Sequence, residues 1–172
     1  MTPTMDNSGV DIVFEDERWE TAGLEGLAAR AFGACFAHLG LEAGRFELAL
    51  LACDDARIAV LNEDFRAKPT PTNVLSWPSE ERAPASPGAR PELPKAGDGP
   101  PCELGDIAIA YETCAAEADA AQKPLADHIT HLLVHGFLHL LGYDHICDED
   151  AALMEACEAE ILGTIGLSNP YE

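Results

Sequence analysis

The sequence predicts an α+β domain in which a small mixed four-stranded sheet packs with about five helices around one buried central helix. Three observations predict this class. Short segments with alternating apolar residues are separated by segments of helical periodicity, the last third of the chain is nearly all helical, and one of its helices is apolar nearly all round. With 172 residues, 47% of them hydrophobic, the chain is long enough for one such domain.

Four segments are predicted as strands. In the first, at residues 10–14, Val10, Ile12 and Phe14 alternate with other residues and therefore share one side of the strand. The other three strands are predicted at residues 45–53, 72–77 and 104–110.

Five helices are predicted, at residues 20–39, 54–65, 111–122, 124–141 and 148–163. Gly40 follows the first of them, at the position of a helix C-cap, and Asp54 or Asp55 is suited to cap the start of the second. Pro124 is well placed in the first turn of the fourth helix. Because that fourth helix is apolar nearly all round, we expect it to be the buried central helix.

Between the third and fourth strands the composition changes. Residues 78–101 contain seven prolines and three glycines and almost no apolar side chains. Such a segment cannot bury enough surface to offset the entropy lost on ordering. The strands on either side are too short to form separate domains. We therefore expect one domain over residues 1–172, with a flexible Pro-rich insertion at about 79–101.

The charge is strongly acidic, with 31 Asp and Glu against 10 Lys and Arg and a formal net charge of −21. Taken alone, this argues against a nucleic-acid partner and favours a small molecule or a protein. No apolar run approaches the ~20 residues needed to span a membrane, and the N-terminus has no signal-peptide pattern. The six cysteines are widely spaced, as is typical of reduced thiols. We expect a cytoplasmic protein that does not bind a membrane.

Three histidines in the fourth helix and just after it predict a metal site. His135 and His139 are four residues apart, so both imidazoles project from one face of the helix. Gly142 can end the helix and turn the chain, which lets His145 return as a third ligand. Three imidazoles suit one Zn²⁺ per chain and leave a fourth position for water, which the metal activates at neutral pH. The pattern therefore indicates a catalytic zinc.

The same spacing occurs in metzincin proteases, where a Glu follows the first His and acts as the general base. Here that position is Gly136. The usual zincin route of peptide hydrolysis is therefore not supported, and the residues imply a different reaction or a different base.

The segment HGFLHLLGYDH at 135–145 resembles the signature of the YbeY-type endoribonucleases, the ribosomal RNA maturation factors. Two upstream blocks, LNEDFRAK at 61–68 with PTNVLSWP at 71–78, and LGDI at 104–107, are similar to family motifs in the same order. Trp77 stands where the family usually has Phe, and Pro69 where an acidic residue is common. The insertion at 79–101 is longer than is typical.

The resemblance implies a single-strand-specific, metal-dependent endoribonuclease that acts in maturation and quality control of small-subunit ribosomal RNA. It implies zinc held by His135, His139 and His145, and it places the family's functional arginine at Arg66. It also implies contacts with small-subunit ribosomal proteins and assembly GTPases. Arg66 suits its role because a guanidinium presents a charged planar fork to phosphate oxygens.

Three further residues are candidates for supporting roles. Lys68 is a candidate for binding a neighbouring phosphate. His131 lies on the same helical stripe as His135, and Asp144 is next to His145, so both are candidates for contacts with the metal ligands. Plain packing for His131 and helix termination for Asp144 are the alternatives.

Two other functions stay open at this point. One is a zinc hydrolase of another substrate class, a peptide or a small molecule. The other is a ribosome-assembly factor whose metal is structural. The residues do not identify the group that takes the proton from the nucleophile.

The charge distribution refines the expectation about RNA. Residues 103–172 hold 14 acids and one cation, whereas residues 1–102 hold 17 acids and nine cations. We expect zinc, Arg66 and Lys68 to form a local positive strip on a repulsive surface. Unaided binding of free RNA should then be weak, with delivery by a protein partner.

Overall fold

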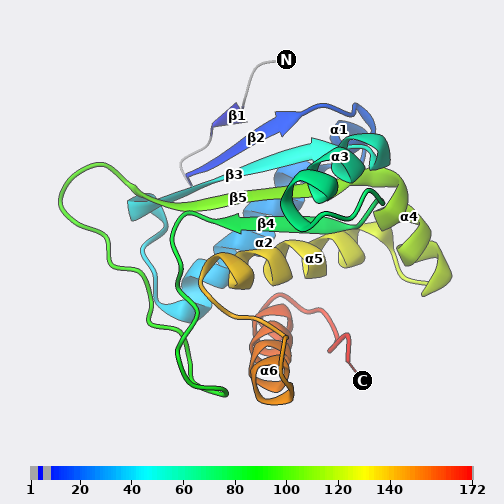
Figure 1. Cartoon of the computed structure of the whole chain (residues 1–172). Helices are drawn as coiled ribbons and strands as arrows, with labels where there is room; N and C mark the ends of the chain where they lie inside the picture. Colours follow the sequence, from blue (N-terminus) through cyan, green and yellow to red (C-terminus); the bar gives the residue numbers. More distant parts are fainter. Residues whose placement is uncertain (1–3, 6–8, 172) are drawn as a thin grey trace.

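The computed structural model describes residues 4–5 and 9–171, and its sheet is mixed, as predicted (Figure 1). All four predicted strands are present: β2 (Val10–Phe14), β3 (Phe46–Cys53), β4 (Val74–Pro78) and β5 (Cys102–Ala110). A two-residue strand, β1 (Thr4–Met5), joins them in the order β1-β2-β3-β5-β4. The β2–β3 and β3–β5 pairs are parallel, whereas β1 and β4 pair antiparallel. Strand β4 therefore forms an edge of the sheet.

The predicted helices are also present. They are α1 (Arg18–Thr21), α2 (Leu24–Leu39), α3 (Asp55–Arg66), α4 (Tyr111–Ala120), α5 (Leu125–Leu140) and α6 (Asp148–Thr164), with a 3-10 turn η1 (Ala43–Arg45) before β3. The prediction of one continuous helix over 20–39 is wrong at its start. Gly23 adopts φ +76°, in the left-handed region, and separates α1 from α2.

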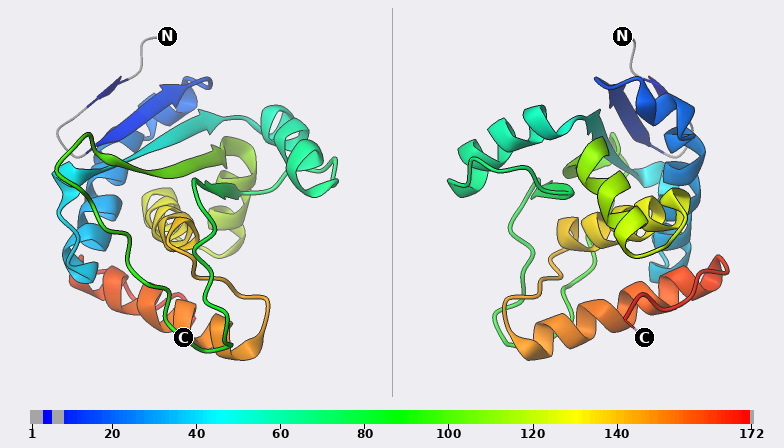
Figure 2. Two further views of the ribbon diagram at one scale, coloured as in Figure 1. Left: turned by 60° about the vertical axis from the view of Figure 1, so that its left-hand side comes forward. Right: turned by 90° about the vertical axis from the view of Figure 1, so that its right-hand side faces the viewer.

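Helix α5 is the buried central helix that its apolar sequence predicts. It lies between the sheet and α6, with α2 beside it (Figure 2). Phe137 of α5 contacts Phe36 of α2 edge to face, with ring centroids 5.1 Å apart. The other face of the sheet carries α3, over a smaller apolar cluster of Cys53, Ile58, Leu75, Ala108 and Ala110. This layering leaves the C-terminal half of α5 next to the edge strand β4.

The Pro-rich segment connects β4 to β5 by a long path that descends toward α6 and returns (Figure 2). Arg82 Nη1 donates to the carbonyl oxygens of Leu104, at 3.2 Å, and Leu140, at 3.0 Å. The backbone amide of Gly88 donates to Asp150 at the start of α6, at 2.8 Å. These bonds tie the segment to β5, α5 and α6, and its flexibility stays a prediction.

Among the described residues, no helix combines the length and the apolarity that crossing a bilayer requires.

Candidate metal centre

A cleft of about 640 Å³ lies where the end of α5 meets the edge strand β4. We call it the histidine cleft. It is lined by Phe65, Arg66, Thr72, Asn73, Val74, Leu75, Ser76, Pro78, Glu80, Glu81, Arg82, Ala83, His135, His139, Gly142, Tyr143, Asp144 and His145. Helix α3, strand β4, the Pro-rich segment and the end of α5 all contribute, so residues distant in sequence share one site.

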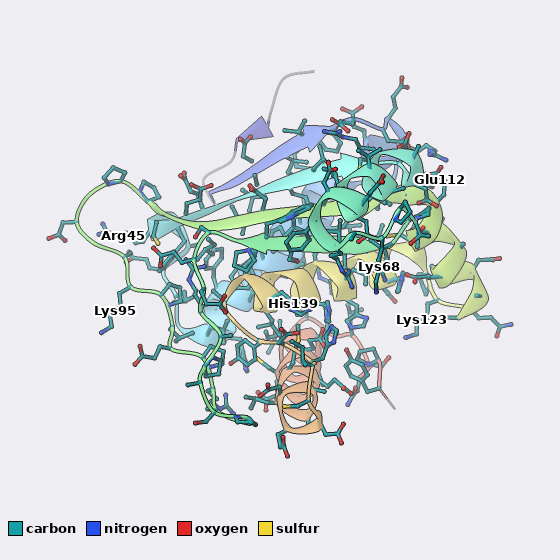
Figure 3. The ribbon with its side chains drawn as sticks, viewed as in Figure 1. Arg45, Lys68, Lys95, Glu112, Lys123 and His139 are labelled. Carbon is teal, nitrogen blue, oxygen red and sulfur yellow. The ribbon has the colours of Figure 1, made fainter. Side chains whose placement is uncertain are left out.

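The structure brings His135, His139 and His145 together in this cleft. One nitrogen from each imidazole lies within 4.8 Å of the other two. The Nε2 atoms of His135 and His139 are 3.0 Å apart, and the His145 ring centroid is 5.1 Å from that of His139. His139 is labelled on α5 in Figure 3. Three converging imidazoles are a donor set that suits a divalent transition metal, zinc above all.

Gly142 makes the turn that returns His145 to the cleft. Its φ is +105°, which is unfavourable for residues with a side chain. A Cβ atom there would lie 2.4 Å from the carbonyl oxygen of Arg82. Both the backbone conformation and the close approach of the Pro-rich segment therefore require glycine.

Gly136, at the position of the metzincin base, faces the sheet. A Cβ atom there would lie 3.2 Å from both Ile107 Cδ1 and Ser76 Oγ. The Ser76 hydroxyl donates to the Gly136 carbonyl oxygen at 3.3 Å, which holds β4 against α5. The close packing of β4 on α5 explains in physical terms why this position carries no glutamate.

Glu158 on α6 contacts the histidine cluster from behind, and the sequence reasoning missed it. Its side chain is fully buried, and Oε1 lies 2.5 Å from His135 Nδ1. The Tyr171 hydroxyl donates to the other carboxylate oxygen at 2.5 Å. An Nδ1–H that donates to this carboxylate leaves Nε2 of His135 with its lone pair directed at the cluster. The buried carboxylate thus fits a metal-ligand role for His135.

Electrostatics keep the cluster in a state that can bind a metal. Burial, together with the neighbouring His135 and His145, lowers the pKa of His139 to about 4, so this imidazole is neutral at neutral pH. Burial alone would raise the pKa of Glu158. Hydrogen bonds with His135 and Tyr171, and the nearby imidazole of His131, outweigh that effect and hold its pKa at about 2. The site therefore combines a neutral imidazole with a buried negative charge, which together favour a cation.

Arg66 reaches the same cleft from the opposite side of the sheet edge. It is the last residue of α3 and is exposed. The turn that follows is held by the buried Asn62, whose Nδ2 donates to the Thr70 carbonyl oxygen at 2.9 Å. Among the described residues, no carboxylate lies within ion-pair distance of Arg66. Its guanidinium is thus available to an anion in the cleft.

Comparison with known proteins shows the family. The model of the family described as "Endoribonuclease YbeY" matches residues 11–166. This chain belongs to the YbeY family. Relatives named Endoribonuclease YbeY from Dinoroseobacter shibae and Ruegeria pomeroyi are each 56% identical to it. The first alignment covers 100% of this chain and 98% of the relative, and the second covers 94% and 97%.

A solved structure shares the YbeY-family fold described above. The solution structure of TM1509 from Thermotoga maritima matches with a TM-score of 0.54 over 95% of this chain and 99% of that protein. The sequence identity is 19%, so this likeness concerns the fold alone. It agrees with the predicted α+β class.

The remaining candidates in this YbeY-family chain lie at different distances from the cluster. His131 Nε2 is 3.7 Å from Glu158 Oε1 and 3.4 Å from the Tyr171 hydroxyl, so it belongs to the polar group around the buried Glu158. Asp144 lines the cleft, but its carboxylate accepts a hydrogen bond from the backbone amide of His145 at 2.8 Å. Lys68 lies on the turn after α3 (Figure 3). It is not among the residues that line the histidine cleft.

One signal in the sequence points to Glu158. Met154 and Leu162, four residues before and after it on α6, are buried, as are Cys157 and Ile161. Glu158 thus lies on the apolar face of the helix, where a carboxylate is costly unless it has a partner. An acid on an apolar stripe is the pattern that would have identified it.

Proposed function

We propose that this chain is a zinc-dependent, single-strand-specific endoribonuclease that acts in maturation and quality control of small-subunit ribosomal RNA. The observation that carries the proposal is the convergence of His135, His139, His145 and Arg66 on one cleft. The relatives from Dinoroseobacter shibae and Ruegeria pomeroyi are named endoribonucleases, which supports the reaction class. The resemblance of the histidine signature and its upstream blocks supports the ribosomal substrate.

In this proposal His135, His139 and His145 hold one Zn²⁺ per chain. When bound, the metal would supply a Lewis acid that makes water nucleophilic near neutral pH. Glu158 keeps His135 in the tautomer whose Nε2 faces the cluster, and His131 and Tyr171 surround that carboxylate. Arg66 binds the scissile phosphate and stabilises the charge that develops there.

The acidity of the chain bears on how RNA reaches the cleft. With a net charge of −21, the surface repels a polyanion, so unaided affinity for free RNA is low. We propose that small-subunit ribosomal proteins and assembly GTPases bring the substrate to the cleft, in the cytoplasm. We also propose that residues 1–172 act as one domain.

Two variants test the assignment. His139→Ala should lose bound zinc and cleavage of single-stranded RNA, whereas Arg66→Glu should keep zinc and lose cleavage. Arg57→Glu is the control, since Arg57 is an exposed arginine on α3 outside the cleft lining, and its ion pair with Glu15 at 3.3 Å is exposed and contributes little to stability. Metal content is measured by elemental analysis and cleavage with a labelled oligonucleotide.

Two results would overturn the proposal. One is a fully zinc-loaded wild-type protein that leaves single-stranded RNA intact while a reference nuclease cuts it. The other is a folded Arg66→Glu variant that fully replaces the wild type in ribosome maturation in cells. That second result would show that docking and not catalysis is the required function.

A further inference from the structure

An exposed aromatic side chain lies at the rim of the histidine cleft. Phe65, in the last turn of α3, leaves 50% of its surface exposed and lines the cleft beside Arg66. Exposure alone does not set this side chain apart, since Val60 on the same helix is equally exposed. Phe65 differs in that its exposed ring lines the cleft.

Trp77 of β4 holds the Phe65 ring in place. The two ring centroids are 5.4 Å apart and the ring planes are inclined by 54°. Trp77 is itself partly buried and packs on the apolar cluster between α3 and the sheet. Phe65 thus rests on a fixed support with much of its surface free, which is the form of a stacking platform.

The balance of charged residues in the cleft indicates how the Phe65 ring could contribute to RNA binding. The cleft is lined by two arginines, Arg66 and Arg82, against three acids, Glu80, Glu81 and Asp144. Arg82 is already engaged with the carbonyl oxygens of Leu104 and Leu140. Neutralisation of phosphates, the usual source of affinity for a nucleic acid, is therefore weak here. Stacking of bases on aromatic rings is the other general source of affinity, and it needs no net positive charge.

We propose that Phe65, supported by Trp77, stacks an unpaired nucleobase of the RNA next to the phosphate that Arg66 binds. This inference rests on the proposed nuclease function. Phe65 and Arg66 line the same cleft, so the ring and the guanidinium can contact the base and the phosphate of one nucleotide region. A base in a duplex is already stacked on both faces, so it cannot stack on the Phe65 ring. The platform thus supplies a physical basis for a preference for single strands.

The test compares Phe65→Leu, which removes the ring and keeps an apolar side chain, with Phe65→Tyr, which keeps the ring. Val60→Thr is the control, because Val60 is also on α3 and 50% exposed but does not line the cleft.

Cleavage is measured on a short single-stranded RNA. We expect Phe65→Leu to raise KM about tenfold, the effect of losing one stacked base. Because stacking holds substrate and transition state alike, kcat should barely change. Phe65→Tyr and Val60→Thr should resemble the wild type in both parameters.

A second arm locates the base. Oligonucleotides with one abasic residue on either side of the mapped cleavage site should raise KM for the wild type at one of the two positions. In Phe65→Leu the same abasic residue should cause no further loss, since its partner is already gone. An unchanged KM in Phe65→Leu, or abasic and Phe65→Leu losses that add fully, would overturn the proposal.

These results are distinguishable from failure of the proposed function. If zinc-loaded wild-type protein cuts no RNA, the nuclease assignment fails whatever Phe65 does. Stacking is then measured by the change in tryptophan fluorescence when the same oligonucleotide is added. Trp77 contacts the Phe65 ring and should respond, whereas Trp19 is fully buried and should not. The emission change should be absent in Phe65→Leu, and its persistence there would count against the platform.

Discussion

The fully buried carboxylate of Glu158, on α6, lies 2.5 Å from Nδ1 of His135, on α5. This contact joins the candidate metal cluster to the C-terminal helix. Removal of a carboxylate that orients a metal-binding imidazole commonly lowers the affinity of the site for its metal. The Glu158–His135 contact should therefore affect both zinc affinity and stability.

Glu158→Gln is expected to lower zinc affinity roughly 10- to 100-fold, because the amide keeps the shape of the side chain but loses its charge. Competition with a chromogenic chelator measures the affinity. Glu160→Gln, an exposed acid two residues along the same helix, should bind zinc like the wild type. Equal zinc affinity in Glu158→Gln and the wild type would refute the role of this carboxylate.

Tyr171→Phe is expected to lower the free energy of unfolding by about 1–3 kcal/mol, because it leaves one oxygen of a buried carboxylate without its hydroxyl donor. Urea unfolding of the zinc-free protein measures this. In a Glu158→Gln background the same change should cost clearly less, since the interaction with a charge is already lost. Equal costs in the two backgrounds would show that Tyr171 acts elsewhere.

Gly142→Ala is expected to destabilise the protein by about 1–3 kcal/mol and to weaken zinc binding. The φ of +105° is unfavourable for alanine, and the new Cβ would lie 2.4 Å from the carbonyl oxygen of Arg82. Relief of this strain would move the turn that carries His145, and zinc binding would weaken as a result. Gly163→Ala is the control, because a Cβ there meets nothing within 4 Å on α6. It should be neutral or stabilising. Thermal unfolding and zinc titration of both variants decide the matter.

Gly136→Glu would recreate the metzincin base in sequence but not in structure. The new side chain would press on Ile107 and Ser76, and a carboxylate would be buried between α5 and β4. We expect a loss of several kcal/mol of stability and no gain of peptidase activity. Gly136→Ala, which adds only the Cβ, should be milder. A stable Gly136→Glu protein that cleaves peptides would contradict this account of the packing.

The sequence by itself identified features that depend on short-range geometry. The four strands and the central helix α5 agree with their predicted positions, and the histidines of α5 meet because four residues make about one helical turn. Gly142 was recognisable as the turn because glycine readily adopts the left-handed conformation that ends a helix. The break at Gly23 was missed, because a single glycine within a helical segment does not by itself show that the backbone changes hand there.

Only the tertiary structure decided which distant side chains meet these histidines. Glu158 reaches His135 because α6 packs across α5, and Arg66 lines the same cleft because β4 places the end of α3 at the sheet edge. The exposed ring of Phe65 likewise takes its meaning from the cleft that it lines. Periodicity encodes the face of one helix, whereas contacts between elements depend on how several layers pack together, and no local pattern carries that information.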